Sequence, residues 1–130
     1  MFDVVEFFKT FGVSYITDAE SQSLNDLSAV ITESQGRHHL DIAIEDAKLI
    51  YGSEITESTM IKHGVYSLAY ASLMPTLRNQ KNSIFNDVEM KEFLETQRSY
   101  KKTGQEAIRS VKPVEQKSKD GYDYNIIRLG

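Results

Sequence analysis

Apolar side chains recur at helical spacing along most of the chain, which predicts a succession of amphipathic helices. The first is expected over residues 4–11 and ends at Gly12, because glycine readily adopts the left-handed backbone that follows a helix. Thr17 and Glu20 have the spacing of a capping box. A second helix is therefore predicted to begin there and to end at Gly36.

Two further helices are predicted in the middle of the chain. Residues 38–51 place apolar side chains on one face, and Gly52 follows as a helix end. The next helix begins after Thr56 and carries two stripes, so other elements are expected to cover two of its faces. One stripe consists of small residues that let another backbone approach closely: Gly64, Ser67 and Ala71. Pro75 is expected to end or kink this helix.

The pattern changes in the last part of the chain. A fifth helix is predicted over residues 86–100, with Gly104 as a break. Beyond it, the Asp120-Gly121 pair is a strong turn signal between two extended runs, 111–117 and 122–129. An isolated hairpin is marginally stable in water, so this segment is expected to pack on its own body or on another chain.

These elements predict a mainly α fold. We expect a small bundle of about five helices over residues 1–110, followed by an extended or β-hairpin C-terminal arm over residues 111–130. The hydrophobic core is expected to consist of Phe7, Phe8, Leu27, Ile31, Ile44, Ala47, Leu68, Ala71, Phe93 and Leu94.

The net charge of −4 is unevenly distributed along the chain. Residues 1–97 hold 7 Lys or Arg against 15 Asp or Glu, a net charge of −8, whereas residues 98–130 hold 8 basic against 4 acidic residues, a net charge of +4. An acidic body argues against a domain that coats nucleic acid. The basic end suits a tail that reaches an acidic surface, such as another copy of the body, and the same composition is also typical of a solvated, disordered tail.

The composition removes several classes of chemistry. The chain has no cysteine, which excludes disulfides, thiolate catalysis and cysteine zinc sites. No apolar run approaches the ~18 residues that span a bilayer, and the first residues carry acids rather than the basic region of a signal peptide. We therefore expect an intracellular protein without membrane association.

The densest set of metal-capable side chains lies around two adjacent histidines, His38 and His39. On a helix His38, Asp41 and Glu45 share a face, and ligands of this kind can hold a divalent cation. A solvated helix face gives the same pattern, and no HExxH motif is present. Nucleophile motifs and glycine-rich phosphate loops are also missing, so we predict no metal, no cofactor and no enzymatic activity.

The C-terminal arm supplies the expected partner-binding residues. Its apolar and polar side chains alternate, as in a strand added to the edge of a partner's sheet, and the lysines before them favour an acidic surface. The predicted partner-binding residues are Tyr122, Tyr124, Ile126, Ile127, Leu129, Lys112, Lys117 and Lys119.

Three blocks of the sequence resemble the head–tail connector (adaptor, or head-completion) proteins of tailed bacteriophages. They read VVEFFKTFGVSYITDAESQSL, IEDAKLIYGSEITEST and HGVYSLAYASLM, and they lie within residues 2–77. In this family a short F-x-x-F helix, a Thr- or Asp-capped helix, a helix ending in Tyr-Gly and a small-residue-rich helix precede an extended arm. The long fifth helix and the Asp120-Gly121 turn depart from that pattern.

The resemblance implies a structural virion protein that forms an oligomeric ring, commonly a dodecamer, between the portal and the tail. It implies portal, tail or neck proteins as partners and an arm that docks on the portal or on a neighbouring chain. DNA would pass through the ring without sequence-specific binding. The implied location is the virion, and the host cytoplasm during assembly.

Two other classes of function stay open at this point. One is a small intracellular helical adaptor or regulator that binds a single partner protein. The other is a metal-dependent or nucleic-acid enzyme, for which the residues offer no site. The oligomeric state separates the ring-forming connector from both, although many connectors are monomers until they meet the portal.

Overall fold

The chain is seen in a computed structural model that describes residues 2–27, 30–56, 58–80 and 86–112. The predicted mainly α fold is confirmed over these residues, and the predicted arm lies almost entirely outside them. The described helices are α1 (Val4–Phe11), α2 (Asp18–Ser21), α3 (Glu33–Tyr51), α4 (Thr59–Gln80) and α5 (Asp87–Ser110).

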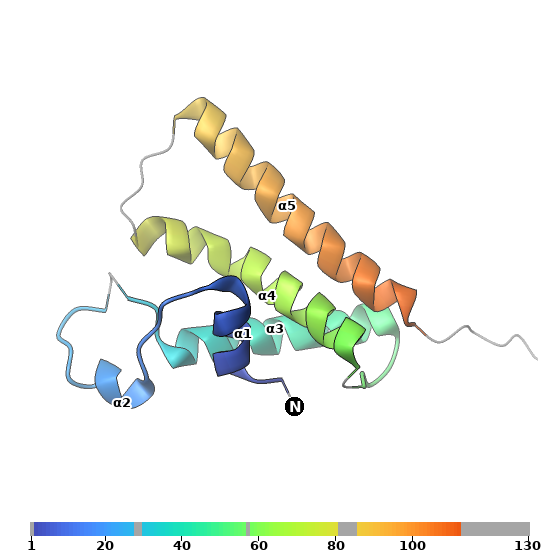
Figure 1. Ribbon diagram of the computed structural model, residues 1–130, viewed down its shortest axis with the longest axis horizontal. Helices are drawn as coiled ribbons and strands as arrows, with labels where there is room; N and C mark the ends of the chain where they lie inside the picture. Colours follow the sequence, from blue (N-terminus) through green and yellow to red (C-terminus); the bar gives the residue numbers. More distant parts are fainter. Residues whose placement is uncertain (1, 28–29, 57, 81–85, 113–130) are drawn as a thin grey trace, which may run out of the picture.

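Helix α4 is central to the molecule. It packs against both α3 and α5, and α1 lies across the α3–α4 pair (Figure 1). Because α4 is covered on more than one side, it is apolar around much of its circumference, as the two predicted stripes require. The largest fully buried side chains of the core are Phe7, Phe8, Ile31, Ile61, Val65, Leu73 and Ile108.

The predicted core is confirmed in part. Phe7, Phe8, Ile31, Ala47, Leu68 and Ala71 are buried. Ile44 packs against the core from its edge and Phe93 is half-buried. The prediction is wrong for Leu27 and Leu94, whose side chains are 42% and 41% exposed. Helical spacing identifies an apolar face but does not reveal whether a neighbouring element covers it.

The predicted long second helix is wrong. Helix α2 begins after Thr17 with the expected Thr17–Glu20 capping box, but it ends at Ser21. A second capping box, formed by Thr32 and Gln35, begins α3. The pattern T-x-x-Q, which has the same spacing as the first box, was the local signal for this second start.

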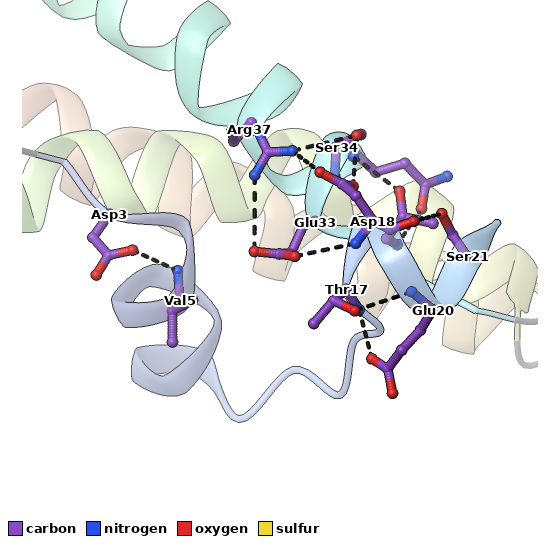
Figure 2. Close-up of polar contacts among 11 residues, drawn as sticks. Asp3, Val5, Thr17, Asp18, Glu20, Ser21, Glu33, Ser34 and Arg37 are labelled. Carbon is purple, nitrogen blue, oxygen red and sulfur yellow. Dashed lines mark hydrogen bonds and ion pairs between the residues drawn. The ribbon is translucent and has the colours of Figure 1, made fainter.

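The starts of α2 and α3 are held side by side by a polar network (Figure 2). Asp18 accepts hydrogen bonds from the backbone N–H (3.1 Å) and the hydroxyl (2.8 Å) of Ser34 and forms an ion pair with Arg37. Glu33 accepts a hydrogen bond from the Asp18 N–H at 3.1 Å. The Ser34 hydroxyl and then the Arg37 guanidinium lower the pKa of the Asp18 carboxyl, which is therefore ionised at neutral pH.

Gly36 and Gly104 do not end helices, contrary to the prediction. Gly36 lies inside α3, where a Cβ atom would be 2.3 Å from the Phe8 ring of α1. Gly104 lies inside α5 and faces Gly64 of α4. In both places the missing side chain makes room for another helix. The local sequence does not distinguish a glycine needed for such packing from one that ends a helix.

The α4–α5 crossing is a close backbone contact. A Cβ atom on Gly64 would lie 2.9 Å from the carbonyl oxygen of Gly104, and one on Gly104 would lie 2.7 Å from that of Gly64. Gly64, Ser67 and Ala71 are all buried, so the predicted close packing along this stripe is confirmed. Gly12 and Gly52, by contrast, have φ values of 65° and 91° and end α1 and α3 as predicted.

We predict that Gly64→Ala and Gly104→Ala each destabilise the protein by about 1–3 kcal/mol, because the added methyl overpacks the crossing. Helix propensity alone would favour alanine by ~1 kcal/mol at these positions. Thr103→Ala, at an exposed site beside Gly104, is the control and should change stability by less than ~0.5 kcal/mol. Urea denaturation measures all three. Stabilisation in either glycine variant would contradict the close crossing.

A tyrosine hydroxyl attaches the start of α1 to α4. Tyr66 is buried, donates a hydrogen bond to a Glu6 carboxylate oxygen at 2.6 Å and accepts one from the Asp3 N–H at 3.1 Å. Lys62 forms an ion pair with the same carboxylate at 3.1 Å. Burial, followed by the hydrogen bond to Glu6, raises the pKa of Tyr66 to about 12.

We predict that Tyr66→Phe lowers the free energy of unfolding by about 1 kcal/mol at neutral pH, because the hydroxyl is lost. The folded-state pKa is raised, so this contribution is complete below pH 10 and disappears as pH rises from 10 to about 12. Denaturation curves of variant and parent at several pH values should converge over that range. A constant difference would contradict the assignment. Tyr15→Phe is the control, because the Tyr15 hydroxyl forms no hydrogen bond with any described residue.

Candidate interaction site

An open groove lies between α3, α4 and α5, with a volume of about 370 Å³. We call it the α3–α5 groove. Helix α4 forms its base with Leu68, Ala71 and Ser72, and Gln97 of α5 also contributes to its lining. The sides carry both apolar and charged groups, namely Ile42 and Asp46 from α3 and Leu94, Arg98 and Lys101 from α5.

The groove follows from the way α5 crosses α4. The two helices touch at the glycine pair, and Figure 1 shows them separating towards the C-terminal end of α4 and the N-terminal end of α5. Long side chains span the wider end: Arg78 Nη1 lies 3.5 Å from Met90 Sδ, and its guanidinium lies 5.3 Å from the Phe93 ring centroid. This divergence leaves Leu94 partly exposed at the edge of the groove.

A proline determines one polar contact in the groove. Pro75 lies inside α4 without ending it, and it has no N–H to donate to the carbonyl of Ala71, four residues earlier. The side-chain amide of Gln97 on α5 donates a hydrogen bond to that carbonyl at 2.9 Å. The contact between helices therefore replaces a hydrogen bond that α4 itself lacks.

We predict that Gln97→Leu destabilises the protein by about 1–3 kcal/mol, because the Ala71 carbonyl then loses its donor. The cost should fall when Pro75→Ala is also present, since residue 75 then supplies an N–H within α4. A double-mutant cycle by chemical denaturation measures this coupling. Additive effects of the two substitutions would show that Gln97 does not replace the missing helix hydrogen bond.

Beside the groove, His39 of α3 contacts Ser72 of α4. The His39 Nδ1 and Ser72 Oγ atoms are 2.6 Å apart. Burial, and then the neighbouring charge of His38, lower the pKa of the His39 imidazole. Activation of a serine–histidine pair requires a third group that orients the imidazole, and no described carboxylate hydrogen-bonds to His39. The geometry supports a polar contact that joins α3 to α4.

The solvent side of α3 forms a second surface, the α3 outer face. It consists of His38, Asp41, Ile42, Glu45, Asp46 and Leu49, all exposed. Leu49 is 82% exposed and Ile42 is 42% exposed. Lys48 lies beside the face and forms ion pairs with Glu45 (3.3 Å) and Glu54 (3.5 Å). The surface is therefore apolar along its middle and acidic at its margins.

The two adjacent histidines diverge in the structure. His38 remains on the α3 outer face with Asp41 and Glu45, whereas His39 turns towards Ser72. Within the described ranges, no group of three or more His, Cys, Asp or Glu side chains is arranged to hold a metal ion. The absence of a bound metal stays a prediction.

The structure places one of the predicted partner-binding residues. Lys112 follows α5 and is exposed, and its Cε would lie 3.7 Å from a Cβ atom added to Gly52 at the end of α3. The predicted hairpin and the remaining partner-binding residues lie outside the described ranges: Lys117, Lys119, Tyr122, Tyr124, Ile126, Ile127 and Leu129.

The sequence interpretation missed the α3 outer face. It assigned the polar side of residues 38–51 to solvent and did not consider the apolar side chains within it. Ile42 and Leu49 are seven residues apart and therefore lie on the same side of the helix, among acidic neighbours. That spacing was the available signal.

Comparisons with protein-family models, curated proteins and solved structures find no match to this chain. Among the described helices, none is long and apolar enough to cross a membrane. The site is therefore characterised by its own geometry, which consists of an open groove of mixed polarity and an adjoining acidic face with exposed apolar side chains.

Proposed function

We propose that the chain is a structural assembly protein, a head–tail connector (adaptor) of a tailed bacteriophage. In this proposal copies form an oligomeric ring between portal and tail, and the resemblance to the connector family implies a dodecamer. The C-terminal arm of each copy docks on a neighbouring chain. The helical body and its open surfaces support this function.

The observation that carries the proposal is the pair of open surfaces on α3. The α3–α5 groove and the α3 outer face both include Ile42 and Asp46, so they form one continuous area. An exposed aliphatic side chain such as Leu49 gains free energy when a partner covers it. Acidic residues at the margins would attract basic side chains of a partner, and residues 98–112 at the end of α5 hold five Lys or Arg against one Glu.

The acidic body also agrees with a conduit for DNA that does not bind a particular sequence. A net charge of −8 over residues 1–97 disfavours the phosphate contacts that dominate binding to nucleic acid. The proposal assigns no catalytic residue, metal or cofactor to the chain. Its partners are the portal protein, tail or neck proteins, and other copies of itself.

A small intracellular helical adaptor or regulator is the second candidate. The α3–α5 groove supports it, because a groove between three helices can accept an apolar side chain from one partner protein. The gene neighbourhood separates the two candidates: terminase, portal and capsid genes beside this gene are expected for the connector. A neighbourhood without them would favour the adaptor.

We predict that deleting residues 113–130 leaves the melting temperature nearly unchanged, because the described residues already form a buried core among themselves. Assembly on the purified portal protein, followed by sedimentation and electron microscopy, should be lost. Added salt should weaken assembly of the full-length chain, since screening reduces the attraction between charged surfaces.

Two results would contradict this account. Unfolding of the shortened chain would show that the arm belongs to its own core. Normal assembly of a folded, shortened chain would show that the arm has no role in docking. A variant with Lys117→Ser and Lys119→Ser in the full-length chain isolates the charge, and it should weaken assembly without abolishing the apolar contacts.

A further inference from the structure

We propose that the α3 outer face is the docking surface for the C-terminal segment 113–130 of this chain. The inference rests on the proposed function, in which this segment docks on a neighbouring copy, and it identifies the surface that receives it. Exposed apolar side chains and the position at which the described chain ends support this assignment.

The apolar part of the surface matches the end of the segment. Ile42 and Leu49 lie two helical turns apart, about 10 Å along α3, and both are exposed. Residues 122–129 carry two tyrosines, two isoleucines and a leucine. Contact between these groups would remove apolar surface from water on both sides.

Two lysines precede the apolar part of the segment, although the segment as a whole is neutral. Residues 113–130 hold three Lys or Arg and three Asp or Glu, and Lys117 and Lys119 are the side chains that could pair with Asp41, Glu45 or Asp46 on the face. Within the described chain, Asp41 and Asp46 form no ion pair and can accept basic side chains. A second copy of the same face would bring acids against acids, which disfavours α3 against α3.

The described chain ends beside this surface. The Lys112 side chain reaches Gly52, and Figure 1 shows the end of α5 close to the end of α3. Helix α3 has 19 residues and is about 28 Å long. Segment 113–130 can span at most roughly 60 Å when fully extended, so the whole α3 outer face of its own chain lies within reach, and the equivalent face of an adjoining copy is the one that the proposed function assigns.

The adjoining groove offers a place for one large side chain. Ile42 and Asp46 belong to both surfaces, and the groove beside them has a volume of about 370 Å³. A segment lying on the α3 outer face could therefore insert an aromatic or aliphatic group between α3 and α5. This continuity favours α3 over the exposed Val88 of α5, which is not among the residues that line this groove.

Cysteine cross-linking in the full-length protein tests the assignment, because the chain has no native cysteine. One chain carries Leu49→Cys and a second, isotopically heavy chain carries Tyr124→Cys. A short bismaleimide should link the mixed chains several-fold more efficiently than it links Tyr124→Cys to Val88→Cys. Val88 is a matched control, since it is an exposed apolar side chain (68%) on a different helix.

The outcome separates this inference from the proposed function. Linkage of positions 49 and 124 between heavy and light chains supports both. Linkage confined to single chains, in a variant that carries both cysteines, supports α3 as the docking surface and contradicts docking on a neighbour. Equal or stronger linkage to position 88 overturns the α3 assignment, while loss of assembly on deletion of residues 113–130 would still uphold the function.

Discussion

The close crossing of α4 and α5 at Gly64 and Gly104 is the contact on which the rest of the structure depends. Two backbones meet where either Cβ atom would lie within 2.9 Å of the opposite carbonyl. A contact this close near one end of α5 lets the helices diverge towards the other end (Figure 1). The divergence exposes Leu94 and opens the α3–α5 groove.

Polar contacts then hold the helices at the separation that the glycines allow. Pro75 leaves the Ala71 carbonyl without a donor inside α4, and Gln97 supplies one from α5 at 2.9 Å. On the opposite side of α4, Tyr66 attaches α1 through Asp3 and Glu6. With α1 and α5 held against α4 in this way, no described element covers the solvent side of α3. The exposed surface of α3 therefore follows from the way the other helices pack.

Much of the fold could be predicted from local patterns, and the failures have a common cause. Capping by Thr17 and the helix ends at Gly12 and Gly52 were recognised because the local backbone determines them. Gly36 and Gly104 were misread as helix ends, because only a neighbouring helix explains a glycine in a continuous helix. The α3 outer face was missed for a related reason: residue spacing places apolar groups on a face, but only the tertiary arrangement determines which faces remain open.

The central claim is that the C-terminal segment is ordered by docking on another copy. Hydrogen–deuterium exchange of the full-length chain, compared between dilute protein and the assembled particle, tests it directly. The account predicts that backbone amides of residues 122–129 exchange without protection in dilute protein and become protected on assembly, because docking on α3 restricts the local opening of the segment. Unchanged exchange of these amides in a verified assembly would contradict the account.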